Sequence, residues 1–190
     1  TLQLFGGDLY VGIMTVTHSV REVVAMPVLG LTHGAQPVIG FNYGAGKYDR
    51  VKSSIRFITA VSLGYTIVVW LLIQAFPAFF IRIFESDPAV LQAGIPSIRL
   101  FFMGFFFMSL QFAGQTIFLA LAMSRFAVFF SIFRKVVLVM PLVILLPRIG
   151  GLGTAGVFLS EPISELIGGV ACFTTMMLVV WRKKGTVPLV

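Results

Sequence analysis

Five apolar stretches, each as long as a membrane-spanning helix or longer, constrain this chain more than any other feature of its sequence. The hydrocarbon core of a bilayer is about 30 Å thick, and about 20 apolar helical residues cross it. The stretches are apolar at nearly every position rather than at alternate positions, which indicates helices and not the strands of a barrel. The sequence therefore predicts an all-α integral membrane protein. We expect its spans over residues 9–43, 55–83, 89–123, 126–146 and 153–181.

The composition excludes the main classes of soluble protein. Hydrophobic residues make up 58% of the 190 residues and charged residues 11%, whereas a soluble domain carries about 25% charged residues. A soluble fold of this size lacks the interior volume to bury 20 Phe side chains beside so many aliphatic ones. A soluble enzyme, a disordered chain and a nucleic-acid-binding domain are excluded on these grounds. The net charge of +7 is expected in a membrane protein, since basic residues collect in its cytoplasmic loops.

The distribution of Lys and Arg residues over the loops predicts the orientation in the membrane. If every span crosses, one side receives eight of the basic residues in loops and tail, and the other side receives two. The eight lie in the 44–56 loop, at Arg125 and in the tail from Arg182, and the two are Arg82 and Arg148. Because loops rich in Lys and Arg stay inside, we expect a multi-pass protein of the plasma (inner) membrane with a cytoplasmic C-terminus.

Glu22 is the first of three acids that lie within predicted spans, where charges are rare and usually face a cavity or a partner. Glu22 follows His18 by four positions, so the two side chains share one face of a helix and form a candidate proton-handling pair. Arg21 is adjacent to Glu22 but points about 100° away on a helix. We therefore expect Glu22 to line a cavity and to help bind a cationic substrate or a proton. The alternative is a structural role, in which Glu22 and His18 hold a neighbouring helix or pair with Arg21.

Glu161 and Glu165, the other two acids, are four positions apart in the last span. Two like charges on one face repel, so one of them holds a proton or faces a cation. Arg134 and Lys135 in the preceding span are the expected partners. A buried structural ion network and a functional site are equally open interpretations.

Several polar and small residues of the spans have both a packing and a functional interpretation. Gln111 and Gln115 lie one turn apart and can hydrogen-bond a substrate or another helix, with helix packing preferred. Two Gly-x-x-x-Gly motifs, Gly30 with Gly34 and Gly40 with Gly44, allow helices to approach closely, and packing is the default interpretation, with a bending hinge as the alternative. Met and Phe side chains in the 101–108 segment can line an adaptable apolar pocket in addition to meeting lipid.

A membrane-embedded enzyme is not expected, because it needs reactive side chains clustered at one depth, and the sequence contains no such cluster. His18 and His33 are fifteen positions apart, about 22 Å along a helix, and cannot share a metal ion. We therefore expect neither a metal site nor a cofactor.

The segment from Gly30 to Ala45 resembles a signature of the MATE multidrug exporters. In that family a helix ends in a Gln-Pro and Gly-x-Asn-x-Gly-Ala pattern, and a basic cytoplasmic loop follows. Gln36-Pro37 and the Gly40 to Ala45 segment match the pattern, with Asn42 in the asparagine position, and residues 47–52 supply the basic loop. The resemblance makes Gln36 and Asn42 candidate site residues.

Two later segments also resemble the family. Arg134-Lys135, with Pro141 and Pro147, is similar to the arginine-containing eleventh helix, and residues 153–165 are similar to the Gly-rich start of the twelfth. The resemblance implies one lobe of a twelve-helix, two-lobed transporter. Residues 1–190 would form the C-terminal lobe with five full helices, residues 1–7 would be the tail of a sixth, and the N-terminal lobe would be missing.

The resemblance also implies an activity and its partners. Family members export small cationic or amphipathic compounds in exchange for protons or sodium. One branch places a cation-binding acid in its tenth helix, but residues 89–123 contain no acid, so the coupling ion, H+ or Na+, stays open. The expected partners are the lipid bilayer, the N-terminal lobe of the same protein and the substrates, without nucleic acid.

Two alternatives to a drug exporter stay open at this point. A lipid-linked oligosaccharide flippase belongs to the same wider superfamily, but the pattern from Gln36 to Ala45 favours the exporter. A structural membrane subunit without transport activity is the other, although it has little use for Glu22, Glu161 and Glu165 within its spans.

Overall fold

Each apolar stretch forms a helix or a run of helices in the computed structural model, which describes residues 1–149 and 151–182. Five of these are long and apolar enough to cross a membrane, and no β-strand occurs in the described part of the chain. The first two spans are α1 (Leu2–Gly44) and α2 (Tyr48–Ala75), and the fifth is α8 (Gly153–Arg182). The prediction of an all-α membrane protein with five spans is confirmed.

The third and fourth spans are built from several helical segments. The third joins α4 (Pro88–Phe101), a 3₁₀ turn η1 (Phe102–Gly104) and α5 (Phe105–Ala120). The fourth joins α6 (Ser124–Ile132), a π-helix η2 (Phe133–Val139), α7 (Met140–Leu145) and a 3₁₀ turn η3 (Leu146–Arg148). Segments of π-helix are rare and often lie at functional sites, so η2 makes the fourth span a candidate contributor to such a site.

Two helix boundaries differ from those expected. For the predicted span 55–83, the helix α2 begins at Tyr48 and ends at Ala75, after which Phe76 adopts φ −125° and ψ 52°. A separate short helix, α3 (Pro77–Arg82), then starts at a proline, whose missing N–H and fixed φ suit a first helical position. The basic residues before Ile55 belong to the helix although they are polar, and hydropathy alone does not detect such an extension.

The helix that contains the predicted span 9–43 also begins earlier, at Leu2. It breaks at Gly7, where φ is 66° and ψ is −166°, a conformation that glycine adopts at little cost. Pro27 and Pro37 lie inside α1 without ending it. Lys183 and Lys184, which count toward the predicted orientation, lie outside the described residues.

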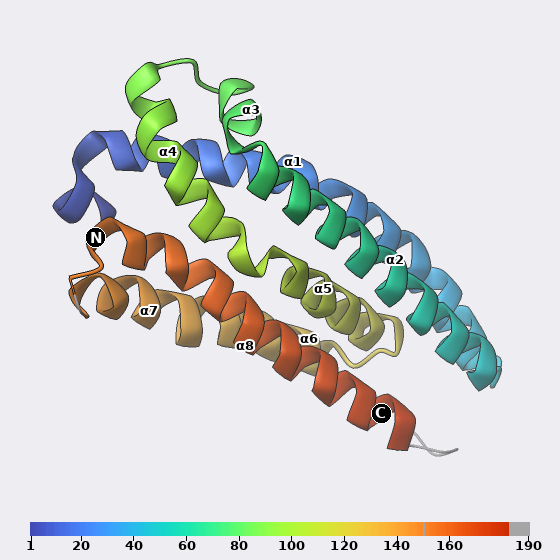
Figure 1. Cartoon of the computed structure of the whole chain (residues 1–190). Coiled ribbons are helices and arrows are strands. Elements are labelled where there is room, and N and C mark those ends of the chain that lie inside the picture. The colour runs from blue at the N-terminus through green and yellow to red at the C-terminus, as the bar shows by residue number, and fades with distance from the viewer. Residues whose placement is uncertain (150, 183–190) are drawn as a thin grey trace.

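The helix α5 lies at the centre of the bundle and packs against α1, α2, α6 and α8 (Figure 1). Two glycines bring α5 and α8 together. A Cβ atom added to Gly114 would meet Cys172, and one added to Gly169 would meet the Phe107 carbonyl oxygen. By contrast, a Cβ atom on Gly30 or Gly34 would meet nothing within 4 Å, so the expected close helix packing is wrong at these two positions. In the second motif, a Cβ atom on Gly40 would lie 3.0 Å from the Ala120 carbonyl oxygen, so Gly40 does pack closely against α5.

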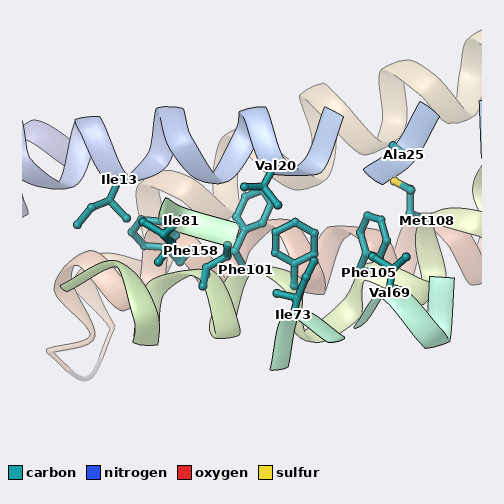
Figure 2. Close-up of a cluster of buried hydrophobic side chains, with 12 residues drawn as sticks. Ile13, Val20, Ala25, Val69, Ile73, Ile81, Phe101, Phe105, Met108 and Phe158 are labelled. Atoms are coloured by element: carbon teal, nitrogen blue, oxygen red, sulfur yellow. The ribbon is translucent and has the colours of Figure 1, made fainter. Parts of the chain in front are cut away.

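The buried apolar side chains form two separate clusters. The first joins α1 to α2, α4, η1, α5 and α8, and Figure 2 shows Val20, Phe105 and Phe158 among its members. The second includes Ile39 of α1, Ile117 of α5 and Cys172 of α8. On α5, Gln111 and Gln115 lie between members of the first cluster and members of the second, and Glu161 and Glu165 do so on α8, whereas Glu22 of α1 lies between two members of the first cluster, Val20 and Ala25. The fold therefore places a polar layer part-way along the bundle, where transporter sites commonly lie.

Candidate functional site

Four charged side chains from three segments meet in this polar layer. Arg21 of α1 donates a hydrogen bond from Nη2 to Glu165 Oε1 at 2.7 Å, and the same nitrogen lies 3.1 Å from Glu161 Oε1. Arg134 of η2 donates from Nη1 to Glu161 Oε1 at 2.9 Å. The four side chains are 2% to 13% exposed. Because charges withdrawn from water are costly unless they are paired, this arrangement stabilises two acids that would otherwise repel each other.

The expected partners of the two acids are partly right. Arg134 does pair with Glu161, but Glu165 pairs with Arg21, and Lys135 is exposed and forms no ion pair with the described residues. The ion network therefore includes α1 as well as the last two spans. Arg134 and Lys135 are consecutive residues of η2, so their side chains point in different directions and only Arg134 is buried.

Glu22 is not part of this ion network, as its position next to Arg21 predicts. It is exposed, and it forms no hydrogen bond or ion pair within the part of the chain that the structure describes. His18 shares a hollow of about 420 Å³ with Glu22, so the expected common face is observed. The two side chains are not hydrogen-bonded, however, and His18 instead packs edge-on against the Phe101 ring at 5.2 Å. A bonded His18–Glu22 pair is therefore not present.

A cavity of about 500 Å³ opens beside the ion network. Its polar lining includes Gln111 and Gln115 of α5, and neither amide hydrogen-bonds to another side chain within the described residues. Both residues therefore line the cavity, and Gln111 is also buried in the bundle, so packing and substrate binding both stay open for them. The lining residues are Arg21, Glu22, Ala25, Met26, Leu29, Met108, Gln111, Phe112, Gln115, Ser131, Arg134 and Lys135.

The two candidates from the family signature lie elsewhere. Gln36 and Asn42 are half-buried near the far end of α1, and neither lines this cavity. Asn42 donates a hydrogen bond to the Val38 carbonyl oxygen at 2.8 Å, one turn earlier in the same helix. The structure therefore separates the signature from the charged cavity.

Two residues that line the cavity, Arg21 and Lys135, are not among the candidate site residues from the sequence. From the sequence, Arg21 is expected only as a partner of Glu22, and Lys135 only as a partner of the acids in α8. The signal for both was present, since each is a cation within a predicted span. Residues 1–149 and 151–182 contain no group of three or more His, Cys, Asp or Glu side chains placed to hold a metal ion.

Comparison with known sequences decides the family. The sequence model of the MatE family matches residues 2–145. The chain belongs to the MatE family. This confirms the resemblance that the Gly30 to Ala45 segment carries. The MatE assignment also agrees with the five-span fold.

Three relatives show how the chain compares with proteins of known name. An FAD transporter of Shewanella oneidensis is 28% identical over 162 residues, which are 80% of this chain and 33% of that protein. A probable multidrug resistance protein NorM of Thermotoga maritima is 27% identical over 110 residues, 58% of this chain and 24% of that protein. The solved MATE multidrug transporter DinF-BH in complex with R6G is 29% identical, with a TM-score of 0.77 over 96% of this chain and 40% of that one. The chain thus spans less than half the length of these relatives.

Proposed function

We propose that this chain is the C-terminal lobe of a secondary active exporter, which moves small cationic or amphipathic compounds in exchange for protons or sodium. The observation that carries the proposal is an exposed, unpaired carboxylate, Glu22, in a cavity of about 500 Å³. Around it, Met26, Met108 and Phe112 supply polarisable and aromatic surface. Such a lining suits amphipathic ligands of different shapes, because Met side chains adapt to what they contact.

Glu22 can act on a cationic substrate because its neighbour does not neutralise it. The Arg21 guanidinium is held 2.7 Å from Glu165 and 3.1 Å from Glu161. An unpaired carboxylate attracts a substrate cation. The Gln111 and Gln115 amides, which offer both donors and acceptors, can orient a polar group of the substrate. A proton or a substrate cation that occupies Glu22 excludes the other, and this competition is what exchange requires.

The experiment compares Glu22→Gln with a matched control in the full protein. The substitution keeps the shape of the side chain and removes its charge, and we expect R6G efflux to fall at least about tenfold at normal membrane levels. Glu85→Gln makes the same chemical change in the exposed loop after α3, and we expect it to leave efflux unchanged. Unchanged efflux by Glu22→Gln, with an unchanged pH profile, would reduce Glu22 to a structural residue.

The second candidate class of substrate is anionic, such as flavin dinucleotides. The basic side chains that line the cavity would attract such substrates. Arg21, Arg134 and Lys135 line it, and Lys135 is exposed without an ion-pair partner among the described residues. The relative named an FAD transporter supports this candidate. Lys135→Gln separates the two classes. If the substrate is anionic, the variant loses FAD export, and if the substrate is cationic, it retains R6G efflux.

A further inference from the structure

A second hollow, of about 560 Å³, lies between α1 and α2, which run side by side (Figure 1). Apart from two serines, its lining is apolar. Gly30 and Gly34 form part of the α1 wall, and the space beside each is open. At the rim, Val38 is 52% exposed and Phe57 is 62% exposed. The hollow is therefore a groove that opens on the outer surface of a membrane-spanning bundle.

The length of the groove matches the depth of one leaflet. Its lining on α1 runs from Gly30 to Val38, a rise of roughly 12 Å at 1.5 Å per residue. Half of the hydrocarbon core of a bilayer is about 15 Å deep. A groove of this length, parallel to a spanning helix, fits an extended acyl chain.

Polar and basic residues lie toward one end of the groove. Ser53 and Ser54 of α2 line it, and Arg50 lies one turn before them on the same face of the helix. Lys47 immediately precedes α2, and Arg50 and Lys47 are both exposed. Within residues 44–56 there are four basic residues and one acid, Asp49. The end of the groove therefore carries an excess of positive charge at the level of lipid headgroups.

We propose that the groove binds one acyl chain of an anionic phospholipid, whose phosphate is held by Arg50 and Lys47. Basic residues next to a membrane-spanning helix attract anionic headgroups, and guanidinium groups bind phosphate through paired N–H donors. The serine hydroxyls lie between the charges and the apolar walls, where the ester groups of a lipid lie. This site is separate from the cavity lined by Glu22 and does not depend on the identity of the exported compound.

The test uses one variant for each half of the site. Gly34→Leu fills the groove, and the open space beside Gly34 accepts the new side chain. Arg50→Gln removes the charge at the exposed start of α2 and leaves the groove open. The matched controls are Gly12→Leu, which also points into open space on α1, and Arg125→Gln, which removes an exposed charge at the start of α6.

Bound lipid is counted by native mass spectrometry of the full protein with phosphatidylglycerol or phosphatidylcholine of identical acyl chains. We expect the wild type to retain phosphatidylglycerol preferentially, and each test variant to lose at least fivefold of it, while both controls retain it. Retention by both test variants would overturn the proposal, as would equal binding of the two lipids with no effect of Arg50→Gln. If Gly34→Leu fails to accumulate, Arg50→Gln alone decides. A photoreactive residue at Ser54 should crosslink to lipid, and a crosslink to protein would assign the groove to another occupant.

Discussion

Replacing Arg21 by methionine should destabilise the protein more than almost any other single change, because it leaves a buried acid without a partner. Glu165 is 2% exposed, and Arg21 is its ion-pair partner among the described residues. Arg134 does not replace it, since its guanidinium is 2.9 Å from Glu161 and forms no pair with Glu165. In Arg21→Met, the Glu165 carboxylate therefore stays buried and loses its charge-assisted hydrogen bond.

The size of the effect follows from the burial of the pair. Removing one member of a buried ion pair costs about 3–5 kcal/mol, mostly as the penalty of the charge left behind. The double variant Arg21→Met/Glu165→Gln removes that charge too, while Glu161 keeps Arg134. We therefore expect the double variant to recover at least about 2 kcal/mol relative to Arg21→Met alone.

The free energy of unfolding can be measured by SDS titration of the full protein in mixed micelles. The fluorescence of Trp70, whose ring packs 5.8 Å from that of Phe106, reports the unfolding. Glu22→Gln serves as the control and should stay within about 0.5 kcal/mol of wild type, since Glu22 is exposed and unpaired. A loss below about 1 kcal/mol in Arg21→Met, or a double variant no more stable than the single one, would refute the reasoning.

Two further predictions concern packing and orientation. Gly169→Ala places a Cβ atom 2.5 Å from the Phe107 carbonyl oxygen and should cost about 1–3 kcal/mol in the same titration, whereas Gly12→Ala, with open space around it, should cost nothing. A cysteine at Tyr48 should resist impermeant thiol reagents added outside intact cells, while one at Ser86, in the loop after α3, should react. Labelling at position 48 with protection at position 86 would invert the orientation.

The five spans could be predicted because burial in a bilayer depends mainly on composition and length. A continuous apolar stretch has one favourable outcome in a membrane, so the helices follow from the sequence directly. The ends of the helices are predicted less well from the sequence. Hydropathy assigned the residues before Ile55 to a loop, although a helix continues into the aqueous region at no cost, and it did not detect the break at Phe76 before Pro77.

Pairing between distant helices was the part that the sequence left open. The adjacency of Arg21 and Glu22 showed that they could not face each other, but it did not show that Arg21 reaches α8, 144 positions away. The π-helix that carries Arg134 has no clear signal in residues 133–139, so the sequence did not predict the local geometry around Arg134. Gly30 and Gly34 had the spacing of a packing motif but face open space, whereas Gly40 of the second motif does lie close to the Ala120 carbonyl oxygen, because spacing alone does not identify the neighbouring helix.

One oxygen atom, Glu161 Oε1, contacts the guanidinium groups of both Arg21 and Arg134. The two acids of the network are therefore not equivalent, because only Glu161 contacts both arginines. If Glu165 is lost, Arg21 still has Glu161 at 3.1 Å, so α1 keeps a connection to α8. If Glu161 is lost, Arg134 has no second acid among the described residues, so η2 loses its ion pair with α8 although the two elements still pack together, while Arg21 keeps Glu165. Neighbouring acids one turn apart therefore tolerate substitution differently, because another acid can replace Glu165 as an ionic link between helices and none replaces Glu161.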